Sequence, residues 1–82
     1  MNISSVIVHA HAVNGAAVQA RLNALDGVEV HGISPEGKII VTIESDDDDI
    51  TIATYTRIGL LEGVLAIAMI YNQSESEPEK EI

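Results

Sequence analysis

The sequence predicts an α+β fold of the ferredoxin-like split βαβ type, in which a four-stranded antiparallel sheet carries two helices on one face. Short segments rich in Val and Ile alternate apolar and polar residues, as half-buried strands do. Two other segments repeat apolar residues every three or four positions, as amphipathic helices do. The order is strand, helix, strand, strand, helix, strand. With right-handed crossovers it places the first and third strands centrally and leaves one sheet face uncovered.

The first predicted strand covers residues 3–10, which are rich in Val and Ile. A helix is expected over residues 13–25, with Asn14 as a candidate cap. Asp26-Gly27 ends this helix, because Gly accepts left-handed backbone. The apolar side chains of the helix recur at spacings of four and three: Val18, Leu22 and Leu25.

A β-hairpin is predicted next. Residues 28–31 alternate apolar and polar, and residues 38–44 form a second, β-branched strand. Between them, Ser34-Pro35-Glu36-Gly37 places Pro and Gly where a tight turn uses them.

A second helix and a last strand complete the domain. The acids of residues 45–49 suit a helix start, where carboxylates accept free backbone N–H groups and oppose the helix dipole. Gly63 ends the helix, and residues 64–71 form the last strand. The domain is therefore expected to cover residues 1–72, followed by a disordered acidic tail over 73–82. The apolar residues of this helix are spaced three apart: Ile52, Tyr55, Ile58 and Leu61.

Composition limits the kind of protein. The 82 residues allow one domain with a single aliphatic core, and the chain has no cysteine for disulfides or thiolate ligands. The net charge of -9 disfavours binding to nucleic acid or anionic membranes and favours a basic ligand, although acidity can also serve solubility alone. No basic leader and no apolar run long enough to span a bilayer is seen, so a cytoplasmic protein is expected.

Alternation also assigns each strand residue to one side of the sheet. The residues expected to face the helices are Val6, Val8, Ala10, Val28, Val30, Ile39, Val41, Ile43, Leu65, Ile67 and Met69. The uncovered side is expected to have an apolar centre of Ile7, Ile40, Ala66, Ala68 and Ile70, with a rim of Ser5, His9, His11, Glu29, His31, Thr42 and Glu44. Such a patch usually marks a contact site. The patch can bind a partner, can pack against a second copy of the chain in a weak homodimer, or can have no binding role.

No constellation predicts catalysis, a cofactor or a metal. His9 and His11 have the spacing of a metal-ligand pair, but His31 is expected about 10 Å from His9, too far to share a zinc ion. The Asp46–Asp49 run lacks the alternating ligands and the glycine of a calcium loop, so a charged helix start is the better interpretation. There is no Cys and no Ser in a nucleophile elbow, and the predicted central strands lack the stacking aromatics of RNA-recognition domains.

Three stretches, in this order and spacing, resemble the NapD family, chaperones for the catalytic subunit of periplasmic nitrate reductase. The resemblance covers about residues 3–71. The stretches are Leu22-Asn23-Ala24-Leu25 with Gly27-Val28-Glu29-Val30, then Gly37-Lys38-Ile39-Ile40-Val41, then Glu62-Gly63-Val64-Leu65-Ala66 running on to Tyr71.

The resemblance implies a cytoplasmic, non-enzymatic chaperone. It would bind the twin-arginine signal peptide of its partner as a helix on the uncovered sheet face and delay export until the molybdenum cofactor is inserted. Glu29 and Glu44 are our candidates for meeting the arginines. A dimeric module that senses a small molecule is the alternative function. The predicted peptide-binding residues are Ile7, His9, His11, Glu29, Ile40, Thr42, Glu44, Ala66, Ala68 and Ile70.

Overall fold

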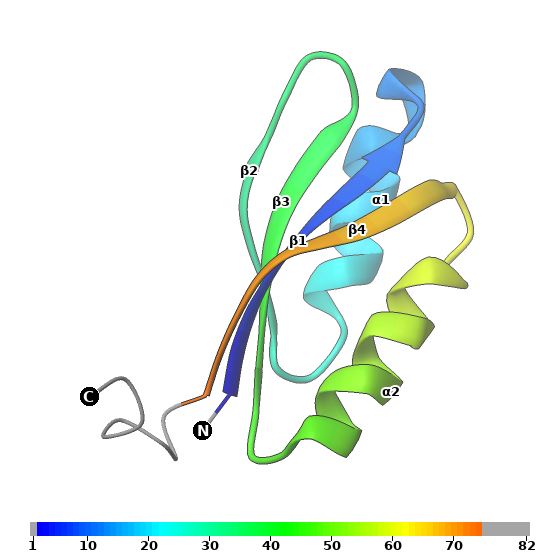
Figure 1. The fold of residues 1–82 in the computed structure, drawn as a ribbon. Coiled ribbons are helices and arrows are strands. Elements are labelled where there is room, and N and C mark those ends of the chain that lie inside the picture. Colours follow the sequence, from blue (N-terminus) through cyan, green and yellow to red (C-terminus); the bar gives the residue numbers. More distant parts are fainter. Residues whose placement is uncertain (1, 75–82) are drawn as a thin grey trace.

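The computed structural model describes residues 2–74 and, of these, the side chains of residues 2–70. The predicted order of strands and helices is confirmed, with a short 3-10 helix added before the first α-helix (Figure 1). The elements are β1 (Asn2–Ala10), η1 (Ala12–Asn14), α1 (Gly15–Asn23), β2 (Val28–Ile33), β3 (Lys38–Ser45), α2 (Asp48–Gly59) and β4 (Val64–Ser74). No helix within these residues is long and apolar enough to cross a bilayer.

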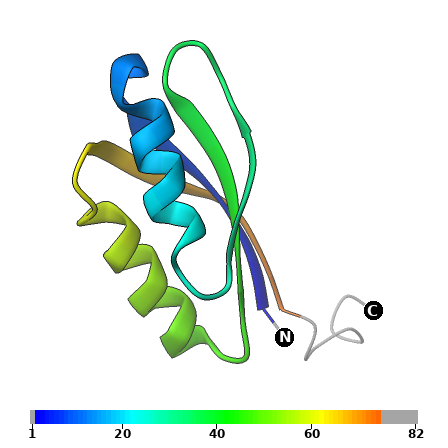
Figure 2. The same cartoon turned by 180° about the vertical axis from the view of Figure 1, so that it is seen from behind.

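The four strands form one antiparallel sheet in the order β2-β3-β1-β4. The prediction that the first and third strands lie at the centre is therefore confirmed. Both helices cover the same face, as Figure 2 shows from the helix side, and within residues 2–74 no helix covers the opposite face (Figure 1). This arrangement is the predicted ferredoxin-like sandwich.

The core lies between the sheet and the two helices. It is aliphatic, as the composition predicts, and every residue of β1, β2 and β3 that is predicted to face the helices is buried or packs against the core. The buried apolar residues are Val6, Val8, Ala10, Val18, Leu22, Val28, Ile39, Val41, Ile43 and Ile58.

Both helices differ in detail from the prediction. Helix α1 starts at Gly15, and the side chain of Asn14 makes no capping hydrogen bond, because η1 precedes the helix. On α2 the four apolar residues spaced three apart do not share one buried face, since Ile52 is 62% exposed while Thr51 is buried. A spacing of three drifts around a helix with 3.6 residues per turn, so Thr51, and not Ile52, shares the inner face with Ile58.

Strand β4 departs from strict alternation at two bulges. At the first bulge, Leu65 is the extra residue and has no partner on β1. Val64 therefore lies opposite Ala10 and packs against the core, while Leu65 is 59% exposed. The prediction that Leu65 points inward is therefore wrong, because the extra residue shifts the alternation. Met69 does lie opposite buried Val6 but is 37% exposed at this sheet edge.

The last strand is also longer than the sequence predicts. It continues to Ser74, two residues into the segment 73–82 that is predicted to be an acidic tail. The remainder of that segment lies outside the described residues.

The hairpin turn depends on Gly37. Its φ is 96°, and an added Cβ would lie 2.0 Å from the carbonyl oxygen of Ala10. We expect Gly37→Ala to lower the free energy of unfolding by about 2 kcal/mol or more, from left-handed strain and this clash. Gly32→Ala is the matched control, because a Cβ there meets nothing within 4 Å. Urea denaturation measures both, and equal effects would contradict the explanation.

Candidate functional site

The open face is the surface of the sheet opposite the helices. Residues that pair directly on antiparallel strands point to the same side, so the register sorts its side chains into four rows across the sheet. We name them the hairpin row (Lys38, His9, Ala66), the apolar row (Gly32, Ile40, Ile7, Ala68), the hydroxyl row (Glu29, Thr42, Ser5) and the Glu44 row (Glu44, Ile3).

The apolar row crosses all four strands without a polar side chain. Ile7 on central β1 lies between Ile40 on β3 and Ala68 on β4, and Gly32 on β2 completes the row. Ile40 is 38% exposed, although it is a large aliphatic residue in the middle of a sheet. The small side chains at the two ends leave the isoleucines standing above their neighbours. The row therefore offers a shallow apolar surface to a ligand.

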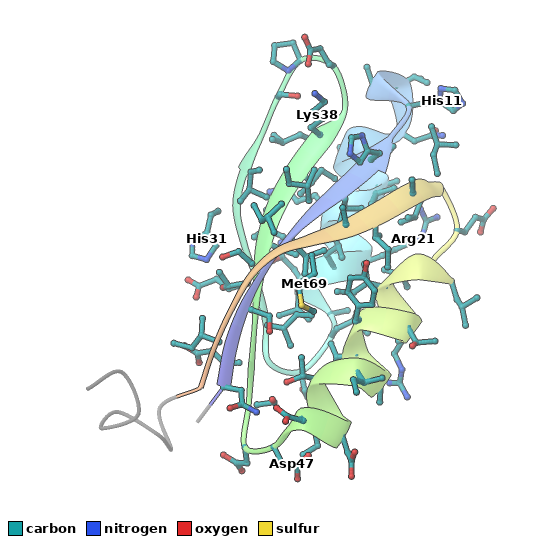
Figure 3. All side chains as sticks on the ribbon, viewed as in Figure 1. His11, Arg21, His31, Lys38, Asp47 and Met69 are labelled. Carbon is teal, nitrogen blue, oxygen red and sulfur yellow. The ribbon has the colours of Figure 1, made fainter. Side chains whose placement is uncertain are left out.

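The hydroxyl row separates the apolar row from the Glu44 row. Glu29 lies opposite Thr42, and the imidazole Nε2 of His31, the bulged residue of β2, lies 2.8 Å from the Thr42 Oγ1. This hydrogen bond places His31 on the open face, as predicted, and Figure 3 shows it at the outer edge of the sheet. Thr42 and Ser5 then present hydroxyl groups at the centre of the sheet.

The two ends of the open face carry opposite charges. At the hairpin end, Lys38 lies opposite His9 and forms an ion pair of 3.9 Å with Glu36. At the other end, Glu44 and Glu29 are exposed diagonal neighbours, which in a sheet places their Cα atoms about 7–8 Å apart. Figure 3 shows Lys38 at the top of the molecule and Asp47, where α2 begins, at the bottom.

A cleft of about 300 Å³ adjoins the Glu44 end. It lies where β2 begins and β3 passes into α2, and exposed Ile50 provides an aliphatic part of its wall. Its lining residues are Asp26, Gly27, Glu44, Ser45, Asp46 and Ile50. Three of the six carry carboxylates, so the cleft is acidic.

The chain turns sharply beside this cleft, and side-chain hydrogen bonds fix the turn. Asp47 caps α2 by accepting a hydrogen bond from the Ile50 N–H at 2.9 Å, which is the helix start that the acids predict. Ser45 donates to the Asp47 carbonyl at 2.9 Å and also contacts the Thr51 hydroxyl. Asn2 donates to Asp48 at 2.7 Å, so α2 is tied to β1 as well.

The structure brings together most of the predicted residues on one surface, with two exceptions. His11 follows the end of β1 as an exposed residue before η1, so it does not share a strand face with His9 (Figure 3). Ile70 is the extra residue of the second bulge in β4, so the register gives it no partner on β1, and it is 56% exposed.

Sequence reasoning missed three residues of the open face. Lys38 and Ile3 follow the same alternation as Thr42 and Ile7, so extending the pattern by one step on each strand finds them. Gly32 was missed for a different reason, because the bulge at His31 changes the phase of β2 and leaves no sign in the sequence.

Metal-binding side chains do not gather on this surface. Within residues 2–74, no three or more His, Asp or Glu side chains are placed to hold one metal ion. What the open face offers is an apolar row between a cationic end and an acidic end. This arrangement suits an elongated ligand that is apolar in one part and basic in another.

The chain is similar to known proteins along the whole length of the domain. The family model described as "NapD protein" matches residues 1–76. "Chaperone NapD" of Escherichia coli (strain K12) is 33% identical over 79 residues, covering 95% of this chain and 91% of that protein, and "Chaperone NapD" of Shigella flexneri gives the same values. The "Solution structure of the E. coli Tat proofreading chaperone protein NapD" has a TM-score of 0.81 at 33% identity, covering 95% of this chain and 83% of that one.

Proposed function

The chain belongs to the NapD family, and from this premise we propose that it is a cytoplasmic proofreading chaperone for a twin-arginine signal peptide. The peptide is that of the catalytic subunit of a periplasmic nitrate reductase, and it lies on the open face. While the chaperone holds the peptide, export is delayed, which gives time for the cofactor of the subunit to be inserted. The chaperone itself does no chemistry on its partner.

The observation that carries this proposal is the apolar row in the middle of an uncovered, charged face. A signal peptide has a basic segment followed by 7–15 apolar residues. The apolar row offers Ile7, Ile40 and Ala68 to the apolar segment, and Glu29 and Glu44 offer carboxylates to the arginines. Each part of the peptide therefore has a complementary part on the same surface.

The charge of the whole chain supports the same ligand. The net charge of -9 attracts a basic peptide over distances of about a Debye length, roughly 8–10 Å at ordinary salt. Of the three Lys and Arg side chains in residues 2–74, Lys38 is on the open face, whereas Arg21 contacts Glu62 and Arg57 lies on α2. Most of the face is therefore free of cations that would repel the arginines.

Calorimetric titration with a twin-arginine signal peptide of a periplasmic nitrate reductase tests the proposal. We expect saturable binding at one peptide per chain. The matched peptide has both arginines replaced by glutamine and keeps the apolar segment, and we expect it to bind at least tenfold more weakly. If the peptide at tens of micromolar gives no heat and no competition, the proposed function is wrong. A stable dimer that does not bind the peptide would favour a small-molecule-sensing module.

The carboxylates of the open face should contribute to the affinity for the peptide by binding its arginines. We expect Glu29→Gln with Glu44→Gln to weaken binding about tenfold, since two exposed ion pairs, each worth up to about 1 kcal/mol, are lost. The loss should shrink as salt is added, because these side chains are exposed. Glu62→Gln, an exposed residue on the helix side, should leave the affinity unchanged. Because Glu62→Gln removes one charge and the double variant removes two, a free-energy loss in Glu62→Gln of about half that in the double variant would mean that net charge alone attracts the peptide.

A further inference from the structure

We infer that the signal peptide binds the open face in one direction only, with its arginines at the Glu44 end and its apolar segment running toward Lys38. This inference rests on the proposed function, and it adds the polarity of the complex and a role for Lys38. Because the basic segment comes first in a signal peptide, the peptide then runs from the α2 start of the sheet toward the β2–β3 hairpin.

The Glu44 end supplies more than one acceptor. Glu44 and Glu29 are diagonal neighbours on the face, and the cleft next to Glu44 adds Asp26 and Asp46. A guanidinium group needs several acceptors around an aliphatic stem, and Ile50 in the cleft wall can contact such a stem. Two neighbouring arginines therefore find separate acceptors at this end, one on the sheet and one at the cleft.

The hairpin end of the open face carries a cation, which disfavours binding of the arginines there. Lys38 is 52% exposed and lies opposite His9, so its ammonium group is on the open face. Its partner Glu36 is 74% exposed at 3.9 Å, so the ion pair is solvated and weak and leaves Lys38 able to repel an approaching arginine. A reversed peptide would place its arginines here.

The spacing of the rows fits the inferred direction. From the Glu44 row to the apolar row is four residues along β1, about 13 Å, which is about nine residues of helix or four of extended chain. From the apolar row to the hairpin row is only two residues, about 7 Å, and this row contributes Ala66 to the apolar surface. Apart from Ile3 in the Glu44 row, the apolar surface lies between the hydroxyl row and Lys38, so most of it lies downstream of the arginines.

A spin label on the peptide tests the direction. The ends of the face are six residues apart on β1, about 20 Å, so a nitroxide at one end of the peptide broadens the two ends of the sheet unequally. We expect a label before the arginines to broaden the amide signals of Glu29 and Glu44, and a label after the apolar segment to broaden those of His9, Lys38 and Ala66. The reverse pattern, or equal broadening at both ends, with binding intact would overturn the inference and leave the proposed function standing. Absence of any binding would instead remove the proposed function on which it rests.

A charge exchange shows whether these charges set the direction. The double variant Lys38→Glu with Glu44→Lys keeps the net charge and changes only exposed side chains. We expect the preference for one direction to be lost or inverted in the labelling experiment, while circular dichroism and the melting temperature stay as in the unmodified chain. An unchanged labelling pattern in this variant would overturn the assignment of Lys38 and Glu44 as the residues that orient the peptide.

Discussion

Ile7→Glu or Ala68→Glu is expected to weaken binding of the twin-arginine signal peptide about 100-fold or more. Both residues are in the apolar row, where the bound apolar segment would exclude water from the new carboxylate. Burying an unpaired charge costs several kcal/mol, and about 2.7 kcal/mol already corresponds to 100-fold. Calorimetric titration of each variant with the same peptide measures the loss.

The matched control for Ile7→Glu is Ile52→Glu. It adds the same charge to the same residue type, but Ile52 lies on α2 with its side chain 62% exposed on the helix layer. Its affinity should equal that of the unmodified chain. A similar loss in Ile52→Glu would show that added negative charge or instability, and not the apolar row, weakens the complex.

The second large effect concerns stability. Ile58→Ala is expected to lower the free energy of unfolding by about 2–5 kcal/mol, because the side chain is fully buried between α2 and the sheet and its removal leaves a cavity. A domain of this size has little stability to spare, since small domains bury a smaller share of their surface. Urea denaturation should show the loss as a lower midpoint with a similar slope.

Ile52→Ala gives the comparison within the same helix. The substitution is identical, but this side chain is mostly exposed, so we expect a change of about 0.5 kcal/mol or less. If the two variants were destabilised equally, the inner face of α2 would not be the one formed by Thr51 and Ile58.

The fold could be predicted because its strands and first helix follow their periods closely. Val6, Val8 and Ala10 alternate without interruption, and Val18 and Leu22 mark one side of α1, so each element has only one way to bury its apolar side. The turn at Gly37 has a sequence signature of its own. Strand order then follows from the handedness of the crossovers.

The errors at Leu65, Ile70 and Gly32 have a common cause, which is a local change of phase. Bulges at Leu65, Ile70 and His31 each insert one residue, and nothing in the types of these residues shows where the alternation shifts. On α2, the spacing of Ile52, Tyr55 and Ile58 fits a helix loosely, and only packing against the sheet decides that polar Thr51 is inside.

The candidate site was predictable in its centre and less so at its ends. Ile7, Ile40 and Ala68 form one row in the register, as alternation predicts. The charge difference between the ends was not predicted, because it needs the pairing of Lys38 with His9 and the position of the cleft beside Glu44. These are facts of register and of the β3–α2 turn, which a single sequence does not fix.

The central claim is that the open face binds the signal peptide, and methyl NMR tests it most directly. Isoleucine side chains report each layer separately: Ile7 and Ile40 on the open face, Ile39 and Ile58 in the core, and Ile52 on the helix layer. On titration with the twin-arginine peptide, we predict large shifts for the methyl groups of Ile7 and Ile40 and small ones for Ile52. Large shifts at Ile52 with Ile7 and Ile40 unmoved would contradict the claim, because the peptide would then bind the helices.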